Sequence, residues 1–190
     1  AELDPGDTAV SAVNVSQRLV DVADAADARL ELTPIGSTNI ITRIRELRRA
    51  DETVPVAGEG NGGIFFPNYR LTRDGAYTAA KFLRLLVDAR ASEVVADYDG
   101  YQNVRINVSY AGDAERDALL AATERAASEA DAEVNTRDGY RLDYGDAWVL
   151  ARPSGTEPMV RIYAEARGKE RAEELADEMA ETLRVAKASV

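Results

Sequence analysis

Strand patterns alternate with amphipathic helical patterns over residues 1–90, and this alternation constrains the fold more than any other feature of the sequence. Thr8–Val15 and Arg29–Thr33 have the composition of strands, and Ser16 and Asp74 stand at the N-cap positions of helical patterns. The apolar stripes of these patterns, which we expect to be buried, are Leu19, Val22, Ala23 and Ala26; Ile40, Ile41, Ile44 and Leu47; and Ala79, Phe82, Leu83 and Leu86. Because strand–helix–strand units pair their strands in parallel, we predict an α/β domain with a mainly parallel sheet.

Residues 102–190 have the pattern of a second, smaller domain. Its strand and helix patterns lie at Gln102–Tyr110, Asp113–Ala130, Glu133–Thr136, Tyr140–Tyr144, Ala147–Arg152, Met159–Ala166 and Lys169–Lys187. Most neighbouring strands are joined by short turns, such as Asp138-Gly139, so we predict a small α+β domain whose antiparallel sheet is covered by two helices. The acidic stretch between the two blocks, residues 91–101, is interpreted as a linker.

A glycine-rich segment, Gly58–Gly63, follows the third strand pattern, Val54–Ala57. Ligands of α/β sheets meet such loops at the carboxyl ends of strands, and glycine lets the backbone approach a ligand closely. The Glu59 carboxylate accepts hydrogen bonds and the Asn61 amide both donates and accepts them, which suits sugar hydroxyls. The alternative is a flexible turn with a solvated Glu59. The spacing of the glycines does not match a nucleotide fingerprint, and there is no Walker lysine.

A second loop, Arg152–Pro158, lies between the last two strand patterns. A phosphate dianion needs several donors that converge on it. The candidate donors are the guanidinium groups of Arg152 and Arg161, the hydroxyls of Ser154 and Thr156, and the backbone N–H groups around Gly155. The alternative is a rigid hairpin turn whose arginines pair with Glu157 and Glu165.

Composition removes several kinds of chemistry. The chain has no Cys and no His, which excludes disulfides, thiol or imidazole catalysis, and metal sites built on those side chains. A net charge of −11 disfavours nucleic acid and anionic membranes as partners. The N-terminal residues lack the features of a secretory signal, so we expect a cytoplasmic location. Abundant Asp and Glu with scarce Lys suggest a halophilic source; an ordinary acidic protein from a GC-rich genome is the alternative.

Together, the two loops resemble those of the α-D-phosphohexomutase family, which includes phosphoglucomutase, phosphomannomutase and phosphoglucosamine mutase. Arg152–Pro158 is similar to the phosphate-binding loop of the family's fourth domain, and Gly58–Gly63 to the sugar-specificity loop of its third. Arg73-Asp74-Gly75 and Thr33-Pro34-Ile35-Gly36 also resemble the family. The resemblance covers nearly the whole chain and implies that it is the C-terminal half of such an enzyme. Gly63 stands where bacterial members usually have His, so the loop resembles the archaeal type.

The resemblance also implies roles for individual residues. Glu59 would bind sugar hydroxyls near O3 and O4, with Asn61 beside it where many members have Ser. The residues that would hold the phosphate not being transferred are Arg152, Ser154, Gly155 and Thr156, with Arg161 as a further candidate. Ser37 lies near another substrate position of the family, and a role as a helix cap is equally open.

The family transfers phosphate from a phosphoserine in its first domain and holds Mg²⁺ on an Asp-rich loop in its second. Neither loop occurs here, so the resemblance implies that this chain has no catalytic, cofactor-binding or metal-binding residues of its own. Asp97-Tyr98-Asp99-Gly100 is superficially similar to a metal loop, but we interpret it as solvated linker.

The implied enzyme is an intramolecular phosphotransferase that interconverts hexose 1-phosphate and hexose 6-phosphate through a bisphosphate. Its implied partners are a phosphorylated hexose and the missing N-terminal half, and this fragment alone is expected to be inactive. Two alternatives stay open: a phosphosugar-binding module without catalysis, and an unrelated acidic interaction domain.

Overall fold

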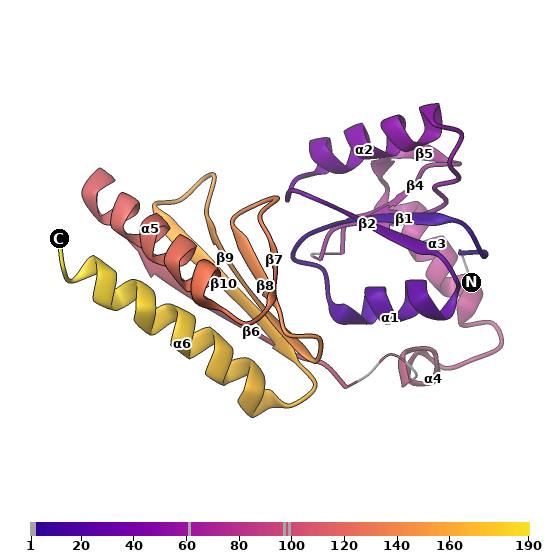
Figure 1. The fold of residues 1–190 in the computed structure, drawn as a ribbon. Helices are drawn as coiled ribbons and strands as arrows, with labels where there is room; N and C mark the ends of the chain where they lie inside the picture. Colours follow the sequence, from indigo (N-terminus) through magenta and orange to yellow (C-terminus); the bar gives the residue numbers. More distant parts are fainter. Residues whose placement is uncertain (1–2, 61, 97, 99) are drawn as a thin grey trace. The chain divides into compact units, whose positions relative to one another are not determined.

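The computed structural model describes residues 3–60, 62–96, 98 and 100–190 (Figure 1). The chain divides into two compact units, Ala1–Asp99 and Gly100–Val190. The boundary lies within the segment 91–101 that we interpreted as a linker, and part of that segment forms a short helix, α4 (Ala91–Ala96).

The first unit is a five-stranded sheet with helices. Its elements are β1 (Thr8–Ala12), α1 (Gln17–Ala25), β2 (Arg29–Thr33), α2 (Ser37–Arg49), β3 (Ala57–Gly58), β4 (Ile64–Phe66), β5 (Arg70–Arg73) and α3 (Gly75–Leu85). The strand order is β2-β1-β3-β4-β5, in which β1 pairs in parallel with β2 and β3. The α/β class with parallel pairing is thus confirmed. Strands β4 and β5 add an antiparallel edge that makes the sheet mixed.

The antiparallel edge follows from the length of the glycine-rich segment. Only Glu59–Gly63 connect β3 to β4, which is enough for a hairpin but far too short for the crossover that a parallel pair needs. The ladder of β3 begins at Ala57, later than the predicted Val54, because Pro55 has no N–H to donate.

Two predicted helix caps are confirmed. The Ser16 hydroxyl accepts a hydrogen bond from the N–H of Arg18 at 3.2 Å, and the Asp74 carboxylate accepts one from the N–H of Tyr77 at 3.0 Å. These bonds satisfy backbone donors that an uncapped first turn leaves without partners. Asp74 therefore fixes where β5 ends and α3 begins.

The core of the first unit lies between the sheet and α2. Its buried members are Val10, Ala12, Ile40, Ile44, Leu47, Val54, Ala57 and Phe65. The stripe predicted for the second helical pattern is thus buried at three of its four positions, with Ile41 partly buried beside them.

The buried face that we predicted for the third helix is wrong. None of the residues of α3, all of which the structure describes, is buried; Phe82 is 43% exposed and Leu83 63%. The apolar spacing identifies one side of the helix, but it does not say what covers that side. Helix α3 follows the edge strand β5 and does not pack into the core beneath α2.

The second unit is an antiparallel sheet with both of its helices on one face, as predicted (Figure 1). Its elements are β6 (Gln102–Ser109), α5 (Asp113–Glu129), β7 (Glu133–Asn135), β8 (Tyr140–Asp143), β9 (Ala147–Pro153), β10 (Met159–Ala166) and α6 (Lys169–Lys187). The strand order is β6-β10-β9-β8-β7, and every neighbouring pair is antiparallel.

Strand periodicity decides which side chains of this sheet meet the helices. Val149 and Ala151 of β9 and Ile162 of β10 are buried with α5 and α6. Successive side chains of a strand point to opposite faces, so Arg152 and Arg161 lie on the face away from the helices. None of the described helices has the length and apolarity to cross a membrane.

Replacing Leu83 by Ala should change the unfolding free energy of the first unit by less than about 0.5 kcal/mol, because its side chain is already largely in water. The matched variant Leu47→Ala, in a leucine 2% exposed on α2, should cost about 2–5 kcal/mol. Hydrogen exchange of the β1 amides reports both values. Similar losses for the two variants would show that α3 is packed.

Candidate functional site

The glycine-rich loop is a closed backbone turn fixed to the centre of the first sheet. The N–H of Glu59 donates to the carbonyl of Gly63 at 3.0 Å, and the N–H of Gly62 donates to the carbonyl of Glu59 at 3.1 Å. Gly62 has φ +88°, a conformation that side chains strongly disfavour. The hydroxyl of Ser11 in β1 donates to the carbonyl of Gly58 at 2.7 Å. These hydrogen bonds hold the described residues of the loop at the end of β3.

The Glu59 carboxylate is almost buried and has a donor for each oxygen. Its Oε2 is 3.0 Å from Nη1 of Arg73, and its Oε1 accepts from the Ser37 hydroxyl at 3.3 Å. The side chain is 8% exposed, so the solvated Glu59 of the alternative interpretation is not observed. Two donors do not exhaust the lone pairs of a carboxylate, which can still accept from a ligand hydroxyl.

Sequence reasoning missed the role of Arg73 and left that of Ser37 open. Ser37 is the first residue of α2, whose N-cap is Gly36, so its hydroxyl serves Glu59 and not the helix end. Arg73 ends β5 and reaches a residue 14 positions earlier. Its place in the Arg73-Asp74-Gly75 motif is the signal that could have found it. Asn61, the other predicted sugar-binding residue of this loop, lies outside the described residues.

A hollow of about 640 Å³ lies beside the loop. Its wall is apolar at Ile64 and Phe82 and polar at Arg73 and Thr78, with the backbone of Gly63 at its rim. This volume is within the range of small-molecule sites, and the mixture of apolar wall and few polar groups is typical of them.

The second loop joins β9 to β10, and an arginine of each strand lies near it. Arg152 of β9 and Arg161 of β10 are direct cross-strand partners, so their side chains leave the same face of the sheet. Two like charges in that relation repel, and each has a carboxylate partner: Nε of Arg152 lies 3.0 Å from Oδ1 of Asp138, and Arg161 pairs with Glu157. The hydrogen bond with Glu157 raises the pKa of Arg161, so the guanidinium stays cationic.

The hairpin alternative is correct for one arginine. Arg161 does pair with Glu157, as that interpretation expected. Glu165, however, is only 3% exposed and accepts from the indole N–H of Trp148 at 3.3 Å. The indole ring in turn lies 4.2 Å from the guanidinium carbon of buried Arg141. This network links β8, β9 and β10 and fixes the strands that carry the two arginines.

The Ser154 hydroxyl organises the loop between the arginines. It accepts from the N–H groups of Thr156 at 3.4 Å and Glu157 at 3.2 Å, while the N–H of Ser154 donates to the carbonyl of Met159 at 2.9 Å. A serine oxygen has two acceptor positions, and both are engaged. What Ser154 offers to a ligand is therefore its O–H hydrogen, next to the exposed residues Gly155 and Thr156.

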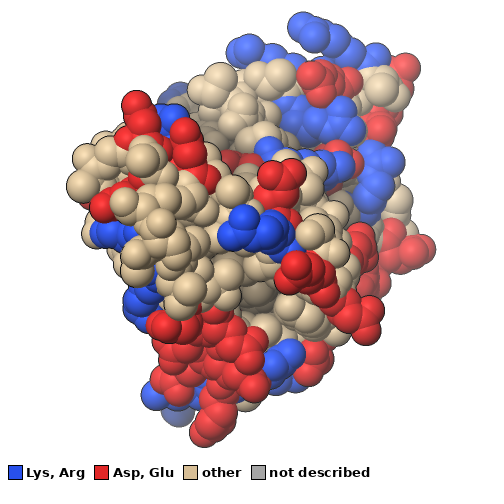
Figure 2. All heavy atoms as spheres, turned by 60° about the vertical axis from the view of Figure 1, so that its left-hand side comes forward, with Lys and Arg blue, Asp and Glu red and all other residues tan. Residues whose placement is uncertain are grey.

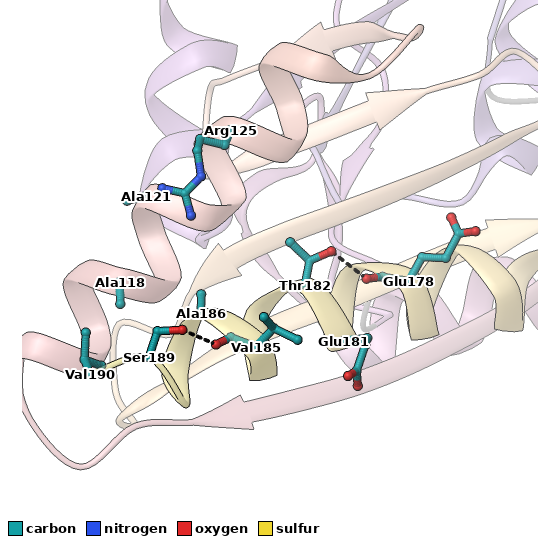
Figure 3. Close-up of a pocket in the computed structure, with 10 residues that line it drawn as sticks. All are labelled: Ala118, Ala121, Arg125, Glu178, Glu181, Thr182, Val185, Ala186, Ser189 and Val190. Carbon is teal, nitrogen blue, oxygen red and sulfur yellow. Dashed lines mark hydrogen bonds between the residues drawn. The ribbon is translucent and has the colours of Figure 1, made fainter.

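A wider hollow, of about 920 Å³, lies between α5 and α6 on the helical side of the second unit (Figure 3). Its hydroxyls bond to their own helix: Thr182 donates to the carbonyl of Glu178, and Ser189 to that of Val185, both at 2.9 Å. No residue of the Arg152–Pro158 loop lines it. Among the described residues that line the groove, Arg125 is the one cation and it lies with two carboxylates, Glu178 and Glu181, so we do not assign the phosphate site to this groove.

The described residues do not fit a metal ion. Among them there is no group of three or more acidic side chains that could hold one, and the chain contains neither His nor Cys. Asp97 and Asp99 of the motif that we interpreted as solvated linker lie outside the described residues.

Comparison with known proteins identifies both units. Residues 1–101 match the family model of phosphoglucomutase/phosphomannomutase alpha/beta/alpha domain III, and residues 103–182 match that of the C-terminal domain of the same family. The phosphoglucomutase/phosphomannomutase of Thermococcus kodakarensis is 32% identical over 89% of this chain and 36% of its own length. The phosphoglucosamine/phosphogalactosamine mutase of Sulfurisphaera tokodaii is 29% identical over 90% of this chain and 37% of its own length.

Solved structures agree with these matches. A phosphoglucomutase/phosphomannomutase family protein of Burkholderia thailandensis superposes with a TM-score of 0.77 at 25% identity, covering 96% of this chain and 38% of its own. An N-acetylphosphoglucosamine mutase of Aspergillus fumigatus, in complex with GlcNAc-6P and magnesium, shares the fold at 16% identity, with a TM-score of 0.62 over 96% of this chain and 39% of its own. The chain therefore spans well under half the length of these relatives.

Arg73→Ala should lower the unfolding free energy of the first unit by about 1–3 kcal/mol, because it leaves a nearly buried carboxylate without its cationic partner. Arg45→Ala, which removes an exposed arginine of α2, should change it by less than about 0.5 kcal/mol. Hydrogen exchange of the β1 amides measures both. An Arg73 variant as stable as the Arg45 variant would contradict the pairing.

Proposed function

The chain belongs to the phosphoglucomutase/phosphomannomutase family, and from that premise we propose that it is the sugar- and phosphate-binding C-terminal part of a phosphosugar mutase. The complete enzyme would interconvert hexose 1-phosphate and hexose 6-phosphate through a phosphoserine and a bisphosphate intermediate. This chain supplies placement of the substrate and no group that accepts or donates the phosphoryl group. The observation that carries the proposal is the pair of opposed arginines, Arg152 and Arg161, in a chain of net charge −11.

Several donors favour a phosphate dianion at the second loop. Arg152 and Arg161 bring two guanidinium groups to one face of the sheet, and Ser154 adds a hydroxyl hydrogen. Thr156 and the backbone at Gly155 are exposed beside them. We propose that these five residues hold the phosphate that is not being transferred. A strongly acidic surface makes a local cluster of cationic donors selective, because it repels anions elsewhere.

The first loop is proposed to recognise the sugar. Glu59 is held in place before any ligand arrives, since Ser37 and Arg73 engage its two oxygens. A preorganised acceptor loses little entropy when a hydroxyl binds to it. Asn61 is proposed to act beside Glu59. The names of two relatives support hexose phosphates and their amino derivatives as the substrate class: the phosphoglucomutase/phosphomannomutase of Thermococcus kodakarensis and the phosphoglucosamine/phosphogalactosamine mutase of Sulfurisphaera tokodaii.

Positioning of the substrate is a contribution to catalysis that this part of the enzyme can make without a reactive group of its own. Phosphoryl transfer depends on positioning and charge neutralisation more than on covalent assistance from the protein. A substrate whose two ends are phosphorylated in turn must be held by either phosphate, so the second loop should bind phosphate irrespective of the carbon that carries it. Mg²⁺ is proposed as the cofactor of the complete enzyme, where it would neutralise charge on the transferred group. Its ligands are not among the described residues, and we assign no step through it to this chain.

The remaining partner would be the polypeptide that carries the phosphoserine and metal loops. The apolar side of α3, with Phe82 and Leu83 exposed, offers a surface for such a contact. A phosphosugar-binding module without catalysis would use the same two loops, and mutase activity of the complete polypeptide separates it from the enzyme. The cytoplasmic location stays a prediction.

The phosphate site can be tested with the chain itself by titrating glucose 1,6-bisphosphate in a calorimeter at fixed ionic strength. Arg152→Ala should weaken binding by about 10- to 100-fold, as the loss of charge-assisted hydrogen bonds implies. Arg125→Ala, which removes an arginine that lines the α5–α6 groove, should leave the affinity within about twofold. Unchanged affinity in the Arg152 variant would place the phosphate elsewhere.

A salt-adapted source is proposed from the charge of the surface. Figure 2 shows one face of the molecule, with a dense group of Asp and Glu side chains at its lower edge; elsewhere on this face acidic and basic side chains alternate, and Lys and Arg gather along its upper edge. Helix α6 carries acidic residues along its length: Glu170, Glu173, Glu174, Asp177, Glu178 and Glu181. Such crowding destabilises the folded state unless ions screen the repulsion.

Thermal unfolding in low and in molar KCl tests that proposal. Screening of the repulsion that goes with the net charge of −11 should increase the unfolding free energy by roughly 1 kcal/mol. In units of the size of Ala1–Asp99 and Gly100–Val190, this gain raises the unfolding midpoint by about 5 °C or more. Equal midpoints in the two buffers would favour the ordinary acidic protein.

A further inference from the structure

The turn between β7 and β8 lies directly against the backbone of Arg152. Gly139 has φ +75°, and a Cβ added there would lie 2.3 Å from the carbonyl oxygen of Ala151 and 2.6 Å from Cβ of Arg152. Both distances are far inside van der Waals contact. Glycine is thus required at position 139 for two reasons: the backbone has a positive φ there, and a larger residue would clash with β9. The register explains the approach, because Tyr140 pairs with Ala151 and Gly139 is the next residue along.

This approach brings the Asp138 carboxylate to the Arg152 side chain. Oδ1 of Asp138 lies 3.0 Å from Nε of Arg152, and the side chains are 16% and 14% exposed. A hydrogen bond to Nε fixes the rotation of the guanidinium plane about the arginine stem. It uses one edge of the group, so the two Nη nitrogens remain as the donors that a bidentate anion would take.

The two arginines of the site differ in how they are held. Glu157, the partner of Arg161, is a loop residue whose side chain is 53% exposed, four positions away in sequence. Asp138 comes from a different hairpin and is shielded from water. An exposed pair of that kind is screened and exchanges readily with solvent, whereas a shielded one persists. Arg152 is therefore fixed before a ligand arrives, and Arg161 is freer to adjust.

We propose that Asp138 and Gly139 are positioning residues of the phosphate site: Asp138 orients the Arg152 guanidinium so that its Nη groups meet the phosphate, and Gly139 allows the turn to come close enough. This inference rests on the proposed role of Arg152 in phosphate binding. It assigns a function to the Asp138-Gly139 pair, which the sequence marked only as a turn.

Asp138 should have two opposite effects on the affinity for an anion, and the direction of the change in affinity when it is removed shows which effect is larger. A carboxylate near the site lowers the local positive potential, so removing it should tighten the binding of an anion if charge alone matters. Orientation works the other way, because a released arginine must be immobilised by the ligand at a cost of about 3- to 10-fold in affinity. The shielded geometry implies that orientation is the larger effect.

The experiment is calorimetric titration of the full chain with glucose 1,6-bisphosphate at fixed salt, for Asp138→Ala, Arg152→Ala and the double variant. Asp138→Ala should weaken binding about 3- to 10-fold in the parent and leave it unchanged in the Arg152→Ala background, since the residue acts through Arg152. Glu133→Ala removes one exposed carboxylate from the neighbouring strand β7 and is the charge control; it should leave the affinity unchanged or slightly tighter.

The outcomes separate this inference from the proposed function. No effect of Arg152→Ala overturns the phosphate site itself. A large effect of Arg152→Ala together with equal or tighter binding by Asp138→Ala overturns the positioning role alone. Equal weakening in both backgrounds also overturns it, because the residue would then act on the fold in general. If the Ala variant does not fold, Asp138→Leu keeps a side chain of similar size and removes the acceptor: weaker binding supports the proposal, and unchanged or tighter binding overturns it.

Discussion

Two arginines are direct partners across β9 and β10, so their side chains leave the same face of the sheet, and the packing of the second unit depends on which face that is. Unpaired, they would repel; with Asp138 and Glu157 beside them, the repulsion is offset and the cations remain available to an anion. Helices α5 and α6 bury the other face of the same strands, which leaves no room for the arginines on that side. Local charge balance and the alternation of strand side chains therefore decide together where the two cations lie, which is where we propose that a dianion binds.

In the first unit, too, a charged group is held by a partner of opposite charge, but here the group is an anion and its charged partner is a cation. There the buried group is a carboxylate, Glu59, and its partners are the cation Arg73 and the hydroxyl of Ser37. In each unit an ionic group is fixed by partners from other elements before any ligand is present. Fixed polar groups are costly to build but bind with little further loss of entropy, which is what substrate placement needs. Each unit therefore holds a polar group in a defined position before a ligand is present.

Local signals predicted much of this structure. The caps at Ser16 and Asp74 and the limits of α6 and β10 agree with the sequence patterns, because they depend on residues within a few positions of one another. The sequence also indicated which loops are rich in donors and glycine.

The sequence could not predict the partners that depend on tertiary contact. Glu59–Arg73 and Asp138–Arg152 each join residues 14 positions apart through the pairing of different strands. The hairpin alternative placed Glu165 beside an arginine of the loop, whereas Glu165 accepts a hydrogen bond from Trp148. The spacing of Phe82 and Leu83 defined a side of α3 without revealing that no part of its own unit that the structure describes buries that side.

Phosphate binding at the loop that follows Arg152 is the proposal on which the roles of the other residues depend. Backbone amide NMR of the chain, recorded while glucose 1,6-bisphosphate is added, tests it most directly. We expect the largest saturable shift changes at Ser154, Gly155, Thr156 and the flanking arginines. Changes confined to the groove between α5 and α6, or the absence of any saturable change, would contradict it.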